Sequence, residues 1–168
     1  GIFILLTSKL NLLLDTIISR CQIVRFRSFS SQQIKFILED YLDTLQLNLN
    51  TKIKFEDLIN SANGSPNKLL KNIEICNDFS DTIISKLDSP IKNILEILEI
   101  SKTISEKLEI YQQICLVNFI QTIWWNKTKN VGLAKNLENL KSLLRKNIQP
   151  RLSWEITFLK ISMEDVLD

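Results

Sequence analysis

The spacing of apolar residues changes along the chain and separates a strand-like beginning from a helical remainder. Residues 2–6 form an unbroken apolar run that ends at Thr7 and Ser8, which is typical of a strand covered on both faces in a parallel sheet. Residues 22–26 alternate in part and predict a second strand. Because two strands alone do not make a stable sheet, we expect the sequence to be the C-terminal part of something longer, or to dock on a sheet supplied elsewhere.

After the second strand the apolar spacing becomes helical. Ser30 and Gln33 have the spacing of a capping box, which predicts a helix over about residues 30–47. A shorter helix is expected over residues 55–62, ended by the sequence Asn-Gly-Ser. A third is expected to begin at Ser65, with its side chain as the N-cap and a proline at the first helical position. The pattern therefore predicts a small three-helix bundle.

The second half of the chain shows helical spacing almost throughout. Ser89, followed by a proline, predicts another helix start, and apolar residues recur at helical spacing over 105–126. Gly132 predicts a break before two further helices, over about 133–147 and 151–165. The fold class predicted from the pattern is mainly α.

Composition agrees with an ordinary globular protein. The chain has 168 residues, of which 45% are hydrophobic, enough to bury a core. No segment reaches the roughly 20 apolar residues that a membrane span needs, and the apolar start lacks the basic region and the cleavage site of a signal peptide. We therefore expect a cytoplasmic protein that makes no membrane contact.

The cysteines indicate a reducing compartment rather than a cross-linked or metal-bound fold. Cys21, Cys76 and Cys115 are far apart, and the sequence contains no histidine. This pattern argues against a zinc site and against a disulfide framework. We interpret the three cysteines as small buried apolar residues and expect no metal.

Charge gives no general sign of a nucleic-acid-binding surface. The net charge is +2, from 21 basic and 19 acidic residues, so contacts with anions would have to be local, and the chain alone is expected to bind DNA weakly. The adjacent Trp124 and Trp125 point in different directions on a helix, so we expect one in the core and one at an interface. The later basic residues lie among Asn and Glu and are interpreted as a solvated helix face: Lys127, Lys129, Lys135, Lys141, Arg145 and Lys146.

No complete catalytic constellation is visible in the sequence. There is no glycine-rich nucleotide loop and no cluster of metal ligands, and carboxylates such as Glu96 and Glu99 have no nucleophile near them in sequence. One arginine stands out, because Arg20 lies between Ser19 and Cys21 with Ile and Val runs on either side. Such a residue either extends its charge to water from a packed stem or points at an anion.

The order of these pieces resembles a bacterial clamp-loader subunit of the AAA+ class, and within it most closely the delta-prime subunit of DNA polymerase III. The resemblance covers the whole chain and rests on "TIISRCQ", on "NGSPNKLL" and on "QPRLSWE". It implies three domains: the C-terminal end of an α/β AAA+ domain over 1–27, a helical lid over 28–79 and a helical collar, used for oligomerisation, over 80–168. The phosphate-binding loop of such a protein would precede Gly1.

The resemblance also assigns roles to individual residues. Arg20 would be an arginine finger that reaches in trans into the nucleotide site of a neighbouring subunit, with Ser19 and Cys21 holding its backbone. Thr7 would take the place of the sensor-1 residue. In the collar, Arg151 and Trp154 would be intersubunit contacts.

Asn67 and Lys68 correspond to the sensor-2 helix of the resembled family. ATP-hydrolysing members usually carry an arginine where this chain has Asn67, and an amide does not supply a charged contact to a γ-phosphate. The departure argues against ATP hydrolysis by this subunit. The resemblance thus implies that the chain alone binds no cofactor, and that ATP and Mg²⁺ are held by a neighbouring subunit.

The expected function is therefore in DNA replication, as a delta-prime-like member of a hetero-oligomer that loads the sliding clamp onto primed DNA. Its expected partners are the other clamp-loader subunits, the sliding clamp, and DNA through the assembled complex. Two alternatives stay open from the sequence. One is an ATP-hydrolysing motor subunit of the same complex, and the other is a non-catalytic helical adaptor that binds protein partners.

Overall fold

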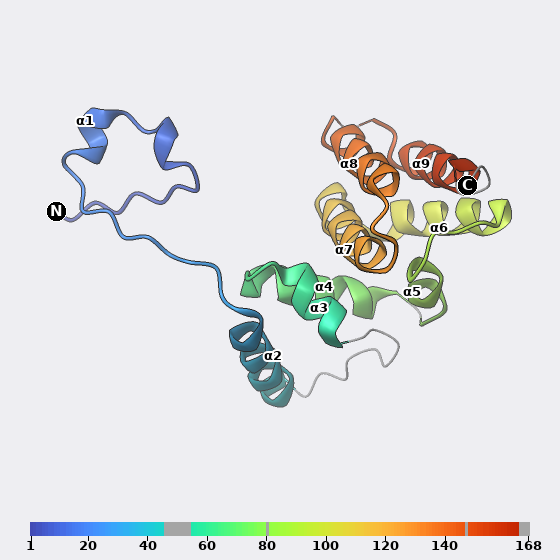
Figure 1. Ribbon diagram of the computed structural model, residues 1–168, viewed down its shortest axis with the longest axis horizontal. Coiled ribbons are helices and arrows are strands. Elements are labelled where there is room, and N and C mark those ends of the chain that lie inside the picture. The colour runs from blue at the N-terminus through green and yellow to red at the C-terminus, as the bar shows by residue number, and fades with distance from the viewer. Residues whose placement is uncertain (46–54, 80, 147, 165–168) are drawn as a thin grey trace.

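A computed structural model describes residues 1–45, 55–79, 81–146 and 148–164 of the chain. In this part of the chain it contains nine α-helices and no strand (Figure 1), which confirms the mainly α fold class. A short 3₁₀ turn at Leu10–Leu12 precedes them. The helices are α1 (Asp15–Ile18), α2 (Ser31–Leu45), α3 (Phe55–Ala62), α4 (Pro66–Asp78), α5 (Asp81–Leu87), α6 (Ile94–Lys107), α7 (Ile110–Thr128), α8 (Val131–Arg145) and α9 (Pro150–Glu164).

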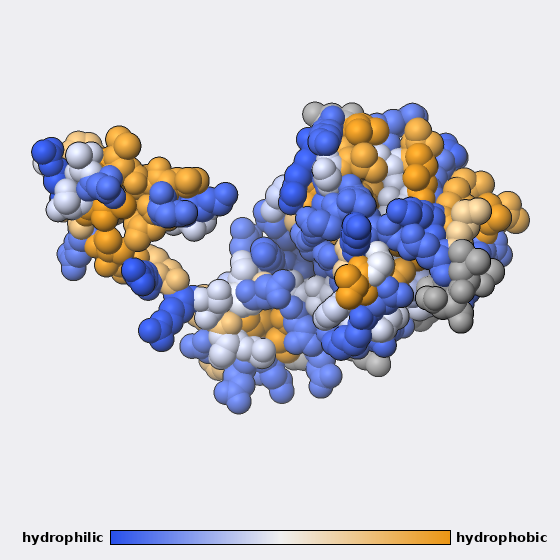
Figure 2. Space-filling view, turned by 45° about the horizontal axis from the view of Figure 1, so that its top comes forward, coloured by the Kyte–Doolittle hydropathy of each residue, from blue (hydrophilic) through white to orange (hydrophobic). Residues whose placement is uncertain are grey.

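The two strands expected near the N-terminus are absent. Residues 2–6 and 22–26 have no regular structure, and Ile2 and Leu6 are 94% and 88% exposed. A strand is stabilised by hydrogen bonds to neighbouring strands, and neither stretch has such a neighbour within the described residues. Residues 1–27, the N-terminal segment, stand apart from the helical body formed by α2 to α9 (Figure 1), and Figure 2 shows hydrophobic residues gathered on the surface of the segment.

The first helices of the body follow the sequence prediction closely. The capping box at the start of α2 is confirmed, since the Ser30 amide donates to Gln33 Oε1 at 2.9 Å and the Gln33 amide donates to Ser30 Oγ at 3.3 Å. The expected end of this helix near residue 47 lies outside the described residues. Helix α3 has the predicted bounds, and α4 begins at the predicted proline, but the Ser65 side chain makes no capping hydrogen bond.

The start of α6 differs from the prediction. The helix begins at Ile94 rather than after the Ser89-Pro90 pair, because the Asn93 side chain accepts the Leu95 amide at 2.9 Å and caps this position instead. Asn93 followed by Glu96 three residues later is itself the sequence signature of a helix start.

The stretch 105–126 is divided between two helices. Helix α6 continues to Lys107, and α7 then begins with a capping box between Glu109 and Gln112. The break expected at Gly132 also falls elsewhere. Lys129 has a left-handed backbone with φ of 51° and ends α7, while Gly132 lies in the first turn of α8.

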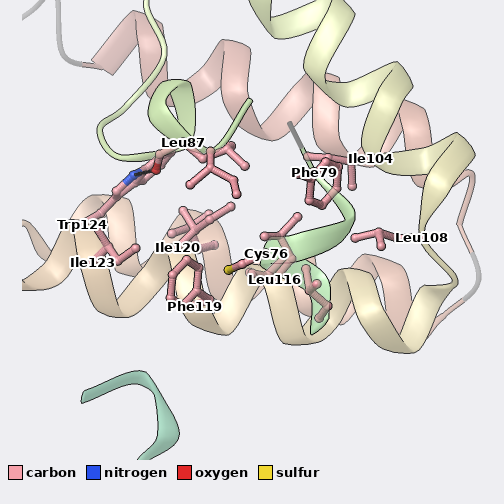
Figure 3. Close-up of a cluster of buried hydrophobic side chains, with 14 of the residues drawn as sticks. Cys76, Phe79, Leu87, Ile104, Leu108, Leu116, Phe119, Ile120, Ile123 and Trp124 are labelled. Atoms are coloured by element: carbon pink, nitrogen blue, oxygen red, sulfur yellow. Dashed lines mark hydrogen bonds between the residues drawn. The ribbon is translucent and has the colours of Figure 1, made fainter. Parts of the chain in front are cut away.

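The buried apolar side chains of the helical body form one core. Trp124, Trp154 and Phe158 are at most 1% exposed, and the Phe158 ring lies 5.2 Å from the Trp154 ring and 6.1 Å from the Trp124 ring, centroid to centroid. Figure 3 shows Cys76 and Phe79, from the end of α4, among side chains of α6 and α7. The core is thus continuous across the boundary expected near residue 79.

Buried polar groups in this core are paired with one another. The Gln113 side chain is 1% exposed, donates to Leu108 O at 2.8 Å and accepts the Trp154 Nε1–H at 2.9 Å. Trp124 donates its Nε1–H to Leu87 O at 2.9 Å, as Figure 3 shows. Among the described residues, Ser101 Oγ is the one buried side-chain oxygen or nitrogen without a partner. Such pairing offsets the cost of burying polar atoms.

Candidate functional site

The turn that carries Arg20 is built by local hydrogen bonds. The Ser19 amide donates to Asp15 O at 2.9 Å, the Arg20 amide to Ile17 O at 3.1 Å, and the Cys21 amide to Ile18 O at 3.3 Å. The Ser19 hydroxyl also donates to Thr16 O at 3.3 Å. The Ser19 side chain therefore contributes to this local turn, and its role in holding Arg20 for a partner stays a prediction.

The Arg20 side chain is exposed at the end of α1. Within the described residues it takes part in no salt bridge, unlike Arg151, which pairs with Glu155. An exposed guanidinium with no carboxylate partner keeps all its donors available to an anion. The geometry is compatible with a contact in trans, which stays a prediction.

Cys21 differs from the expectation of a buried apolar residue. Its side chain is exposed and its thiol is free, whereas Cys76 is buried and Cys115 is half-buried. Burial raises the pKa of the Cys76 thiol to about 12, because an apolar environment disfavours the thiolate. Among the described residues, no group of His, Cys, Asp or Glu side chains could hold a metal ion.

Thr7 is engaged with its own neighbourhood. Its Oγ1 accepts the Lys9 amide at 3.1 Å and donates to Lys9 O at 3.3 Å, so the side chain closes a local turn. It is exposed and does not end a strand, contrary to the expected setting of a sensor-1 residue. Its sensor role stays a prediction.

Asn67 and Lys68 lie in the first turn of α4, and both are exposed. The structure does not bring them together with Thr7 and Arg20, because the N-terminal segment stands away from the helical body (Figure 1). The structure therefore does not gather these four residues into one pocket.

The expected intersubunit role of Trp154 is wrong for this side chain. Trp154 is 0% exposed and its indole nitrogen is bonded to Gln113 within the same chain, so no surface of the ring is left for a partner. Arg151 on the same helix is exposed, but its Nε donates to Glu155 Oε1 at 2.8 Å. Of the adjacent tryptophans, one was expected in the core, and this is confirmed because Trp124 is 1% exposed. Trp125 is 41% exposed, and its expected place at an interface stays a prediction.

Lys141 does not belong to a solvated face. Only 7% of the residue is exposed, and its ammonium donates to Asn118 Oδ1 at 3.0 Å and to Gln121 Oε1 at 2.9 Å while also pairing with Glu138. The bonds to Asn118 and Gln121 join α8 to α7. Sequence reasoning missed this buried lysine, because a lysine among Asn and Glu has the pattern of a surface residue.

Comparison with known families decides what this helical body is. A family model described as cyanobacterial DNA polymerase III delta prime, C-terminal domain, matches residues 32–161. The chain belongs to this family. The match extends from α2 to α9, so the delta prime resemblance seen in the sequence is confirmed for the helical body, and the family indicates a clamp-loader subunit of DNA polymerase III.

The family match leaves residues 1–31, including Arg20, outside its range. No curated protein and no solved structure matches the chain. No helix in the described part of this delta prime domain has both the length and the apolar character needed to cross a membrane.

Proposed function

We propose that the chain acts in DNA replication as part of a delta prime subunit that supplies Arg20 in trans to the ATPase site of a neighbouring subunit. The family match over residues 32–161 carries the assignment to a delta prime subunit, and the role of Arg20 rests on its sequence motif. The exposed position of Arg20 in the "TIISRCQ" sequence supports it. In this proposal ATP and Mg²⁺ bind in the neighbour, and the assembled ring loads the sliding clamp onto primed DNA.

The chemistry suits an arginine. Its guanidinium is always charged and presents a planar fork of donors, which stabilises the charge that spreads over a transferring phosphoryl group. The short helix α1 and the Ser19 hydrogen bond to Thr16 hold the backbone of the turn. The side chain is then free to extend toward another subunit.

The proposal is tested by Arg20→Ala in a reconstituted clamp loader. Removing an arginine finger lowers the rate roughly 10³–10⁵-fold at the affected site, so DNA-stimulated ATP hydrolysis of the whole ring should fall in part, because only the adjacent site loses its finger. Arg20→Lys should rescue poorly, since an ammonium keeps the charge but loses the fork.

Arg25→Ala is the matched control, because Arg25 is also exposed and lies outside the motif. It should leave hydrolysis unchanged. Wild-type hydrolysis and clamp loading by the Arg20→Ala ring would remove the finger role and favour a helical adaptor. Hydrolysis of ATP by the isolated full subunit would instead favour a motor subunit.

A further inference from the structure

In the described residues, one backbone hydrogen bond ties the stretch that follows the Arg20-bearing N-terminal segment to the helical body. The Phe29 amide, two residues before α2, donates to Gly64 O at 3.0 Å. Gly64 lies in the turn between α3 and α4, so this bond ties the stretch before one helix to the connection between two others. We call the contact of Gly64 with Ser28 and Phe29 the junction.

The backbone conformation at the junction favours glycine. Helix α3 ends at Ala62 and is followed by two successive left-handed residues, Asn63 and Gly64, with φ angles of +48° and +72°. Asparagine tolerates this region better than most residues, and glycine adopts it without steric cost. A residue with an ordinary side chain at position 64 would strain the turn that starts α4.

Glycine is also needed at position 64 because the backbone of residues 28–29 lies too close for a side chain. A β-carbon at position 64 would lie 2.6 Å from Phe29 O and 2.7 Å from Ser28 Cβ. Both distances are far below van der Waals contact, and both atoms are fixed by the backbone, so neither can rotate away. A side chain at position 64 would therefore push the stretch at residues 28–29 off the helical body.

We infer that Gly64 is a positioning residue for Arg20, because the junction sets the direction in which the Arg20-bearing segment leaves the helical body. This inference rests on the proposed function of Arg20. The body has the buried core and the segment does not, so the body provides the fixed frame. A displacement of a catalytic group by about 1 Å lowers a rate by as much as about 10²-fold, so a change at the junction should act on the neighbour's chemistry.

The test compares two glycine-to-alanine variants. Gly64→Ala adds a methyl group at the junction, whereas Gly132→Ala adds the same group in the first turn of α8, where the nearest atom is the side-chain Oδ1 of Asn130 at 3.1 Å. In the chain itself, amide hydrogen exchange at Phe29 should lose its protection in Gly64→Ala and keep it in Gly132→Ala. In a reconstituted clamp loader, Gly64→Ala should lower DNA-stimulated ATP hydrolysis toward the level of Arg20→Ala.

A second variant separates positioning from a loss of folding. Gly64→Asn accepts the left-handed backbone as Asn63 does but still brings a β-carbon against Phe29 O. It should keep the helical circular dichroism of the wild type and still lose both the Phe29 protection and the hydrolysis.

The outcomes distinguish the inference from the proposed function. Wild-type hydrolysis in Arg20→Ala would overturn the finger role itself. Reduced hydrolysis in Arg20→Ala together with wild-type hydrolysis in a folded Gly64→Asn ring would overturn the positioning role alone. Unchanged Phe29 protection in Gly64→Asn would overturn the junction.

Discussion

The N-terminal segment and the helical body differ in where their hydrogen bonds and apolar side chains go. In residues 1–27 the described hydrogen bonds connect residues at most four positions apart, and the apolar side chains of residues 2–6 are exposed. In the body, bonds such as that from Trp154 to Gln113 span 41 positions, and the tryptophan is fully buried. The body holds itself together, whereas the segment has only local turns.

This difference separates the region that is stabilised by its own packing from the region that carries the proposed contact of Arg20. The body carries the family match, and its polar groups serve its own packing. The segment carries the exposed Arg20, for which a contact with an anion is proposed. An exposed apolar surface next to such a residue is typical of a region completed by further protein contacts. The position of Arg20 relative to the body therefore depends on the junction at Gly64.

Among variants that should still unfold cooperatively, the largest expected effect is in the core of the body. Trp154→Ala removes a ring that is 0% exposed and leaves the buried Gln113 Oε1 without its donor. Replacing a buried aromatic residue by alanine typically costs about 3–5 kcal/mol of unfolding free energy. Urea unfolding followed by circular dichroism measures this loss.

Trp154→Phe separates the loss of the hydrogen bond to Gln113 from the loss of the buried ring. It keeps most of the ring but removes the Nε1–H, so the expected cost is about 1–3 kcal/mol, the penalty for an unsatisfied buried acceptor. Wild-type stability in both variants would contradict the core position of Trp154 and return it to the collar interface.

Most helices of the body could be predicted from the sequence, because capping residues and prolines close in sequence mark where a helix starts. Ser30 with Gln33 predicted the start of α2, and the proline after Ser65 predicted the start of α4. The prediction at Ser89 failed because two capping signals lie close together, and the side chain of Asn93 forms the hydrogen bond. Choosing between neighbouring caps requires the packing of the helix that follows.

The strands failed for a different reason. An apolar run predicts burial, but burial in a sheet needs neighbouring strands, and residues 2–6 have none within the described chain. The roles of Trp154 and Lys141 were also beyond the sequence, because both depend on which helix lies opposite. A tryptophan on a helix is compatible with a core or an interface, and the burial of Trp154 and its bond to Gln113 place it in the core.

A smaller effect is expected from the ionisation of Cys76. Burial raises the pKa of this thiol from 9.0 to about 12, so the folded state keeps its proton at pH values where the unfolded state has lost it. The stabilisation is complete below pH 9.0 and is lost as the pH rises toward about 12. At one pH unit above the unfolded pKa the loss is about 1.4 kcal/mol.

The measurement is the unfolding free energy of the wild type and of Cys76→Ala at a series of alkaline pH values. Other groups titrate in the same range, so the difference between the two proteins isolates the thiol. The wild type should lose stability more steeply than Cys76→Ala. Parallel pH profiles would show that Cys76 ionises as readily in the folded body as in the unfolded chain.

The smallest effect is expected in the N-terminal segment, and it tests the comparison most directly. Leu6 is 88% exposed, whereas Leu69 on α4 is 0% exposed. Leu6→Asp in the chain of residues 1–168 replaces one solvated side chain by another, so the unfolding free energy should change by no more than about 0.5 kcal/mol. Leu69→Asp places a carboxylate in the core, where an unpaired charge is strongly unfavourable, and should abolish cooperative unfolding. If urea unfolding shows a similar large loss for Leu6→Asp, the segment packs on the body in solution and the contrast drawn between the two regions is wrong.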